Sequence, residues 1–283
     1  MKRIYLMIIV ALLTSVSVSA KGKKQLVILH TNDTHSTVMP LNENLDNKDL
    51  AGRGGFLRRV NMVKEQRQQH PNLLLIDSGD FSQGSGYYTL FKGEVEVGLM
   101  NEMGYDAATI GNHEFDFGLD NMAKLFRMAN FPIVCSNYDC TGTVLEGLVK
   151  PYITIKRDGV KIGFFALAPQ MKGLVFDGNC EGIVYLDPAE TAQKYIDILR
   201  KQEKCDVVIC ISHLGWGGEY DDAKFIGLTE GCDLVLGGHT HTYMPVMEYT
   251  PDKNGKQIPV DQNGKHGVFV GKIVLSLDRK SVV

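Results

Sequence analysis

Short apolar segments of this chain repeatedly end in aspartate, asparagine or histidine, and this pattern constrains the fold more than any other feature. Five segments are followed by candidate metal-binding side chains: Asp33 with His35, then Asp80, Asn112, His213, and His239 with His241. In open α/β sheets, ligand-binding residues gather beyond the carboxyl ends of the strands. The five segments are therefore predicted to be strands whose ends converge on one site.

The rest of the chain alternates between strand and helix patterns. Asp187-Pro188 is a typical helix start, and Asp158-Gly159 is a typical hairpin turn. The expected strands are residues 25–30, 72–76, 107–110, 131–136, 152–156, 160–168, 207–212, 233–236 and 268–277, and the expected helices are residues 52–69, 94–103, 120–128, 188–201 and 221–229. This order predicts an α/β fold with helices outside the sheets, and a turn-rich stretch over residues 251–267.

The amino-terminal residues 1–20 have the pattern of a signal peptide, with basic residues, an apolar run and a small-residue cleavage site at Val18-Ser19-Ala20. An uncleaved membrane anchor is the alternative. Residues 21–283 suit one large catalytic domain. Later apolar runs are only strand-sized, so we expect no membrane association after cleavage. The signal-peptide pattern predicts a periplasmic or secreted protein.

The charge and the cysteines exclude some classes of function. Loss of Lys2 and Arg3 with the signal peptide changes the formal net charge from −3 to −5. No basic face for nucleic acid is expected on such a protein. The six cysteines are Cys135, Cys140, Cys180, Cys205, Cys210 and Cys232. No pair has zinc-ribbon spacing, so mostly buried thiols, with at most a disulfide bridge, are favoured over a catalytic role.

The candidate ligands suit a pair of metal ions. Imidazole and carboxylate groups bind zinc, manganese or iron, and the set contains no thiolate, which argues against a structural zinc site. Seven ligands are too many for one tetrahedral ion. Two ions about 3.5–4 Å apart, sharing a bridging carboxylate, would use them and are typical of phosphoryl transfer.

The segment Gly111-Asn112-His113-Glu114-Phe115-Asp116 adds a proton carrier beside these ligands. His113 can carry a proton, and Asp116 can orient its imidazole. Each motif taken alone has an ordinary structural explanation, but five of the chain's eight histidines lie in these motifs. The other three, His30, His70 and His266, are interpreted as structural or surface residues.

The series of motifs resembles the calcineurin-like metallophosphoesterases. The segments that carry the resemblance are Asp33-x-His35, Gly79-Asp80, Gly111-Asn112-His113-Glu114, Ser212-His213 and Gly238-His239-x-His241. Thr31-Asn32-Asp33-Thr34-His35 and the Gly111–Asp116 segment resemble more narrowly the amino-terminal catalytic domain of 5′-nucleotidases, in the bifunctional UDP-sugar hydrolase/5′-nucleotidase branch. The resemblance spans about residues 26–277 and implies a four-layer α/β/β/α sandwich with two central sheets.

The resemblance also implies a role for each site residue. Asp33, His35 and His241 would bind the first divalent ion; Asn112, His213 and His239 would complete the second; and Asp80 would bridge the two. The ions can be zinc, manganese, iron or cobalt. His113 and Asp116 match the family's catalytic pair. Glu114 is expected to make a structural hydrogen bond, and Arg53 to be a solvated residue near a helix start.

The implied reaction is hydrolysis of nucleoside 5′-monophosphates to nucleoside and phosphate by attack of a metal-activated hydroxide. The 5′-nucleotidases that it resembles carry a second domain that binds the nucleoside, and this sequence stops at Val283 without one. Alternatives are a phosphodiesterase or pyrophosphohydrolase on cyclic nucleotides or nucleotide sugars, and a metal-binding catalytic subunit that needs a separately encoded nucleoside-binding partner. A sulfur-ester hydrolase is a remote further alternative.

Overall fold

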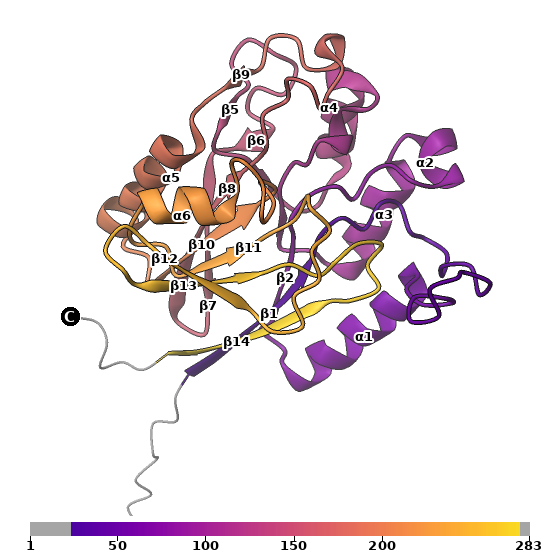
Figure 1. The fold of residues 1–283 in the computed structure, drawn as a ribbon, viewed down its shortest axis with the longest axis horizontal. Coiled ribbons are helices and arrows are strands. Elements are labelled where there is room, and N and C mark those ends of the chain that lie inside the picture. Colours follow the sequence, from indigo (N-terminus) through magenta and orange to yellow (C-terminus); the bar gives the residue numbers. More distant parts are fainter. Residues whose placement is uncertain (1–23, 278–283) are drawn as a thin grey trace, which may run out of the picture.

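The computed structural model describes residues 24–277, so the predicted signal peptide over residues 1–20 lies outside the described range. Two six-stranded sheets form the centre of the protein (Figure 1). In spatial order, the first contains β14 (Gly271–Leu277), β1 (Lys24–Thr31), β2 (Leu74–Asp77), β3 (Ala107–Ala108), β4 (Ile133–Val134) and β6 (Val149–Lys150). The second contains β12 (Glu248–Pro251), β13 (Gln257–Asp261), β11 (Leu234–Leu236), β10 (Val207–Ser212), β8 (Val160–Leu167) and β7 (Tyr152–Arg157). A small antiparallel pair joins β5 (Tyr138–Asp139) to β9 (Val184–Tyr185).

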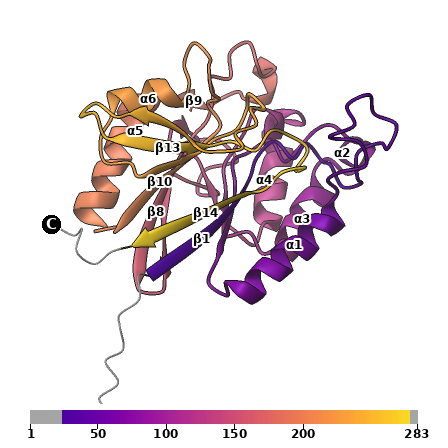
Figure 2. The same ribbon diagram turned by 60° about the horizontal axis from the view of Figure 1, so that its bottom comes forward.

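Both sheets have a parallel interior; the second has two antiparallel edge strands, whereas the first has one, β14, and ends on its other side in β6, which runs parallel to β4. β1 runs parallel to β2 and antiparallel to β14, which lies beside it in Figure 2. β10 runs parallel to β8 and β11, while β7 and β12 run antiparallel to their neighbours. The predicted hairpin turn is confirmed: Asp158 and Gly159, between β7 and β8, both have positive φ (50° and 76°), as tight hairpin turns require.

Helices cover the outer face of each sheet (Figures 1 and 2). The α-helices are α1 (Phe56–Gln69), α2 (Gly86–Phe91), α3 (Glu94–Met103), α4 (Gly118–Met128), α5 (Pro188–Asp197) and α6 (Asp222–Leu228), and the short helical turns are η1 (His113–Phe115), η2 (Asp177–Asn179) and η3 (Ile198–Gln202). Residues of α1, α3 and α4 share one buried cluster with the first sheet. Residues of α5 and α6 share another with the second sheet.

The third buried cluster lies between the two sheets. It contains Leu26 and Ile28 of β1 and Phe164 of β8, whereas Val27 and Leu29 belong to the cluster beneath the helices. Successive side chains of a strand point to opposite faces, so a strand that packs on both faces is apolar throughout. The four layers predicted from the resemblance are therefore confirmed.

The element boundaries differ from the sequence prediction in several places. α1 starts at Phe56 rather than at residue 52 because Gly52, Gly54 and Gly55 all have positive φ (68°, 73° and 89°). α2 was not predicted. The stretch 251–267 was predicted only as turn-rich, and the strand within it, β13, which buries Ile258 and Val260 in alternation, was missed. The predicted helix over 188–201 is α5 followed by a π-helical turn, η3.

Two further predictions concern the cysteines and the membrane. All six cysteines lie within residues 24–277 as free thiols, and all but Cys180 are buried. This agrees with the preference for buried thiols, and the described chain forms no disulfide bridge. Over the same residues, no helix has the length and apolarity that crossing a membrane requires.

Candidate metal centre

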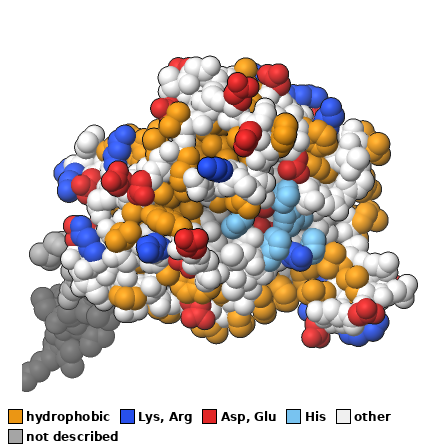
Figure 3. All heavy atoms as spheres, turned by 45° about the horizontal axis from the view of Figure 1, so that its top comes forward, with side chains coloured by type: hydrophobic (Ala, Val, Ile, Leu, Met, Phe, Trp, Pro, Cys, Tyr) orange, Lys and Arg blue, Asp and Glu red, His pale blue; other side chains and the backbone are white. Residues whose placement is uncertain are grey.

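The candidate ligands meet where the carboxyl ends of the two sheets come together. Asp33 and His35 follow β1, Asp80 follows β2, and Asn112 follows β3. His213 follows β10 of the second sheet, and His239 and His241 follow β11. Figure 3 shows histidine side chains gathered on one face, with hydrophobic side chains beside them. The convergence of strand ends that the sequence predicted is therefore present.

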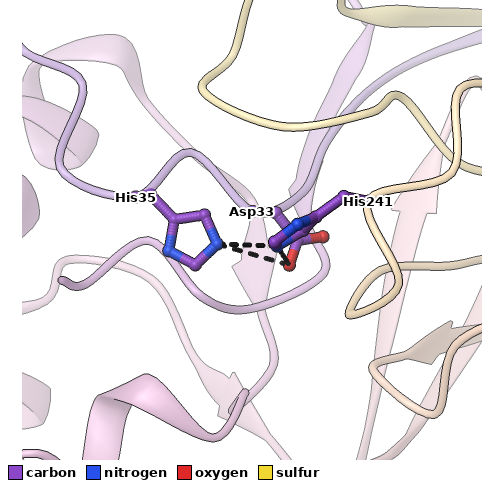
Figure 4. Close-up of side chains that lie close together, drawn as sticks. All are labelled: Asp33, His35 and His241. Atoms are coloured by element: carbon purple, nitrogen blue, oxygen red, sulfur yellow. Dashed lines mark hydrogen bonds and ion pairs between the residues drawn. The ribbon is translucent and has the colours of Figure 1, made fainter. Parts of the chain in front are cut away.

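The first group of side chains joins the two sheets through Asp33, His35 and His241 (Figure 4). The Nε2 atoms of His35 and His241 lie 2.9 Å apart. They lie 3.8 Å and 3.4 Å, respectively, from Oδ1 of Asp33. Two imidazole nitrogens and one carboxylate oxygen thus converge on a single point, as the ligands of one cation do.

The second group contains Asp80, His213 and His239. Nδ1 of His213 donates a hydrogen bond to the carbonyl oxygen of Ser78 at 2.5 Å. Nε2 of His213 lies 3.1 Å from Oδ2 of Asp80, but it forms no hydrogen bond of acceptable geometry within residues 24–277. When Nδ1 carries the only ring proton, the lone pair on Nε2 faces a carboxylate, an arrangement that a cation between the two would stabilise.

A second buried atom without a partner in the described chain lies beside this group. Oδ1 of Asn112 is buried and accepts no hydrogen bond from the described residues. His113, the residue after Asn112, is held against the carboxylate of Asp80, because its backbone N–H donates to Oδ1 of Asp80 at 2.9 Å. Buried polar atoms normally have a partner. Two unpartnered atoms that both belong to predicted ligands fit a bound metal ion.

The pKa shifts of Asp80 and His213 also indicate that the site favours a cation. Burial raises the pKa of Asp80, but the positive charge of His213 outweighs it and holds that pKa well below its usual range. Burial lowers the pKa of His213, but the carboxylates of Asp80 and Asp33 raise it to about 10. The site therefore favours positive charge between these groups, and a proton or a metal ion can supply it.

The backbone of the ligand loops adopts an uncommon conformation. Five predicted ligands have positive φ: Asp33 (48°), His35 (43°), Asp80 (53°), His239 (77°) and His241 (56°). This region is unfavourable for residues other than glycine, and such residues cluster at functional sites. Glycines permit the close packing that holds these loops, since a Cβ at Gly111 would lie 2.1 Å from Oδ1 of Asp80.

Comparison with known proteins assigns the family. The model of the family described as calcineurin-like phosphoesterase matches residues 26–243. The chain belongs to this family. As the resemblance predicted, the chain is also similar to 5′-nucleotidases, over 93% of its length.

The chain is similar to several longer proteins. It is 32% identical, over 93% of its length, to the trifunctional nucleotide phosphoesterase protein YfkN of Bacillus subtilis and covers 19% of that protein. It is also 32% identical to the snake venom 5′-nucleotidase of Gloydius brevicauda, over 93% of this chain and 47% of that protein. The crystal structure of a 5′-nucleotidase precursor from Thermus thermophilus superposes with a TM-score of 0.82 at 28% identity, covering 90% of this chain and 52% of the other. The chain thus spans about half the length, or less, of these three relatives.

The predicted proton carrier lies beside the candidate metal centre and is partly exposed. Nδ1 of His113 lies 3.3 Å and 3.2 Å from the two carboxylate oxygens of Asp116. The ring centre of His113 is 5.5 Å from that of His35. The hydrogen bond with Asp116 raises the pKa of His113 above its ordinary value, and burial opposes this effect. Both side chains are about one-third exposed, so a substrate can reach them.

Glu114 has the structural role that the sequence suggested. Its side chain is 1% exposed and accepts three backbone N–H groups, from Asp80 (3.0 Å), Ser82 (3.1 Å) and Gly111 (2.6 Å). It therefore connects the loop after β2 to the loop after β3. Both loops carry predicted ligands, so Glu114 acts on the site by fixing their positions.

His266 lies closer to the site than the sequence indicated. Its ring centre is 6.0 Å from that of His35, and its backbone N–H donates to the carbonyl oxygen of Asp33 at 2.7 Å. The strand before His266, β13, was not predicted from the sequence, so no sequence signal pointed to this histidine. His30, by contrast, is a structural residue as predicted, because its ring contacts Asp261 and Ser78 and is fully buried.

Proposed function

We propose that this protein is an exported two-metal phosphoesterase that hydrolyses nucleoside 5′-monophosphates to nucleoside and phosphate. The observation that carries the proposal is the pair of adjoining ligand groups at the sheet ends. The groups approach each other at Asp33, whose Oδ1 lies 3.9 Å from Nε2 of His213. Adjoining groups of this composition suit two divalent ions better than one.

The proposed ligands are divided between two ions. The first ion would be held by Asp33, His35 and His241, and the second by Asn112, His213 and His239, with Asp80 shared. Bound divalent ions of this kind activate water for attack and neutralise charge on the phosphoryl oxygens. Imidazole, carboxylate and amide ligands accept zinc, manganese, iron or cobalt, so the donor set leaves the metal open.

His113 would supply the proton that the leaving group needs. As the water oxygen forms its bond to phosphorus, the bond to the ester oxygen breaks, and that oxygen takes the electron pair. Nδ1 of His113 is engaged by Asp116, so Nε2 is the atom from which a proton would pass to the ester oxygen. Asp116 would hold the ring in position and stabilise its protonated form.

Nucleotides are the proposed substrates because the relatives are a nucleotide phosphoesterase and a 5′-nucleotidase. The export proposal rests on the signal-peptide pattern of residues 1–20 and places the protein in the periplasm or outside the cell. Residues 21–283 would form the catalytic domain. A separately encoded nucleoside-binding protein is a candidate partner.

The test measures phosphate release by the purified protein with manganese or zinc added separately. The substrates are AMP, a cyclic nucleotide, a nucleotide sugar and an aryl phosphate. We expect AMP hydrolysis that His113→Ala lowers strongly and that His70→Ala, a change at a histidine outside the site, leaves unchanged. Turnover of AMP that survives His113→Ala would refute the proposed proton donor. Preference for the cyclic nucleotide or nucleotide sugar would favour the diesterase alternative, in line with the trifunctional name of the Bacillus relative.

A further inference from the structure

An apolar groove lies beside the candidate metal centre. Its walls are the segment 36–42, which follows His35, and residues 84–91, which include α2. The groove has a volume of about 460 Å³, within the usual range for small-molecule sites. We refer to it as the α2 groove. Its lining includes Met39, Leu41, Tyr87, Leu90, Phe91 and His266.

The α2 groove lies next to the candidate metal centre, and His35 and His113 are the site residues nearest to its walls. His266 lines the groove, and its ring centre lies 6.0 Å from that of His35. The backbone of Gly84, also in the lining, packs so closely on His35 that an added Cβ would lie 2.9 Å from its carbonyl oxygen. α2 is tied to the proton carrier as well, because the hydroxyl of Tyr88 donates to the carbonyl oxygen of His113 at 3.1 Å.

The chemistry of the α2 groove differs from that of the metal centre. Large apolar side chains are exposed along it: Leu90 by 75%, Met39 by 61%, Phe91 by 49% and Tyr87 by 38%. Among the described residues that line it, none is lysine, arginine, aspartate or glutamate. A phosphate group would find no charged partner in this lining, whereas an uncharged flat group would cover apolar surface and meet two aromatic rings.

The two walls are held together before any ligand binds. The hydroxyl of Ser36 lies 2.5 Å from that of Ser85, so it links one wall to the other. Ser36 also donates to the buried carboxylate of Glu96. Ser85 caps α2 by accepting the backbone N–H groups of Tyr87 and Tyr88. A preformed groove of this kind binds its ligand at a lower entropic cost.

We propose that the α2 groove is the subsite for the leaving group of the substrate, and that it takes a planar aromatic group such as a nucleobase or an aryl ring. The inference rests on the proposed phosphoesterase function and specifies its substrate class. It gives this domain its own means of recognising a nucleotide, separate from any second domain or partner.

The kinetic test uses Phe91→Ala combined with Leu90→Ala. We expect kcat/KM for AMP and for an aryl phosphate to fall by roughly 5- to 100-fold, the loss typical of removing a stacking contact to a base. Hydrolysis of ethyl phosphate, whose leaving group is too small to reach the groove, should be unchanged. The control is Phe176→Ala, at an exposed aromatic residue outside the groove lining. Equal losses on all substrates, or unchanged AMP hydrolysis, would overturn the proposal.

A binding measurement separates this proposal from the proposed function. Calorimetry with adenosine, which has no phosphate, should detect binding to the unmodified protein and at least fivefold weaker binding to the double variant. Adenosine binding lost in the double variant would support the groove even if no phosphate ester were hydrolysed. If AMP were hydrolysed and the double variant left adenosine binding unchanged, the proposed phosphoesterase function would stand, and the α2 groove would not be the leaving-group subsite.

Discussion

Replacing Glu114 with glutamine tests whether one buried carboxylate holds the ligand loops. Oε2 accepts the N–H groups of Asp80 and Gly111, and Oε1 accepts that of Ser82. A glutamine has one acceptor oxygen, so its amide group must face one of these backbone donors. The amide N–H₂ and the backbone N–H that then face each other are both unpaired buried donors. At about 1–3 kcal/mol for each unpaired buried donor, the two together should destabilise the folded state by about 2–6 kcal/mol.

The assay is thermal unfolding at about pH 8, together with calorimetric titration of manganese or zinc. Burial, reinforced by the charge of Asp80, raises the pKa of Glu114 to about 7, so the higher pH keeps the carboxylate ionised. At roughly 2–4 °C per kcal/mol for a large domain, Glu114→Gln should lower Tm by about 4–24 °C. Metal affinity should weaken by about 10- to 100-fold, as it does when supporting residues of a metal site are changed.

Glu94→Gln is the matched control, because Glu94 is an exposed carboxylate whose partner is the exposed Lys124. Such surface pairs contribute at most about 1 kcal/mol. If Glu114→Gln had the same Tm and metal affinity as this control, the three hydrogen bonds would not be what positions the loops. Loss of stability with unchanged metal affinity would likewise contradict the proposed connection between Glu114 and the site.

Three further predictions concern the proton carrier, a buried carboxyl and the metal. His113→Ala should lower kcat by roughly 10²- to 10⁴-fold without changing the number of bound ions measured by elemental analysis; loss of the metal would assign His113 a different role. Burial raises the pKa of Asp77 to about 8 from the ordinary 3.8. The protonated Asp77 therefore stabilises the folded state at low pH, and this contribution is lost as the pH rises from 3.8 through about 8. Asp77→Asn should therefore show a smaller fall in Tm between about pH 5 and pH 9, and a fall as steep as that of the unmodified protein would disprove the shift. Treatment with a chelator should abolish phosphate release and lower Tm, with recovery on adding manganese or zinc, and full activity after chelation would exclude the metal mechanism.

The layers of the fold could be predicted because their signal is local. Strands buried on both faces, such as β10, are apolar throughout, and the helix starting at Pro188 has its own cap in Asp187. The shortest strands could not be delimited, because β3 and β4 have two residues each and depend on their neighbours in the sheet. β13 was missed because its buried residues alternate within a segment rich in turn-forming residues.

The convergence of the candidate ligands could be predicted because each follows a strand, whereas the residues that support them have no such signal. Glu114 is recognisable as a support only when its three backbone partners, from two loops, are seen together. His266 reaches the site through the long connection from β13 to β14, and nothing in its local sequence marks it. The α2 groove was missed for the same reason, since it joins two segments about fifty residues apart that only the tertiary structure brings together.

The division of the ligands between the two sheets explains how strained loops can persist at this site. The two groups described above, Asp33 with His35 and His241, and Asp80 with His213 and His239, each take residues from both sheets, so a bound cation would connect the sheets. The same junction has a second set of connections made by protein alone: His30 bridges Asp261 and Ser78, and the hydroxyl of Ser78 donates to the carbonyl oxygen of Leu236. Because these buried hydrogen bonds hold the sheet ends together, the ligand loops can keep positive φ angles and unpartnered lone pairs. The junction therefore holds the candidate ligands in position before a cation binds. Positive charge between these groups then stabilises their carboxylates.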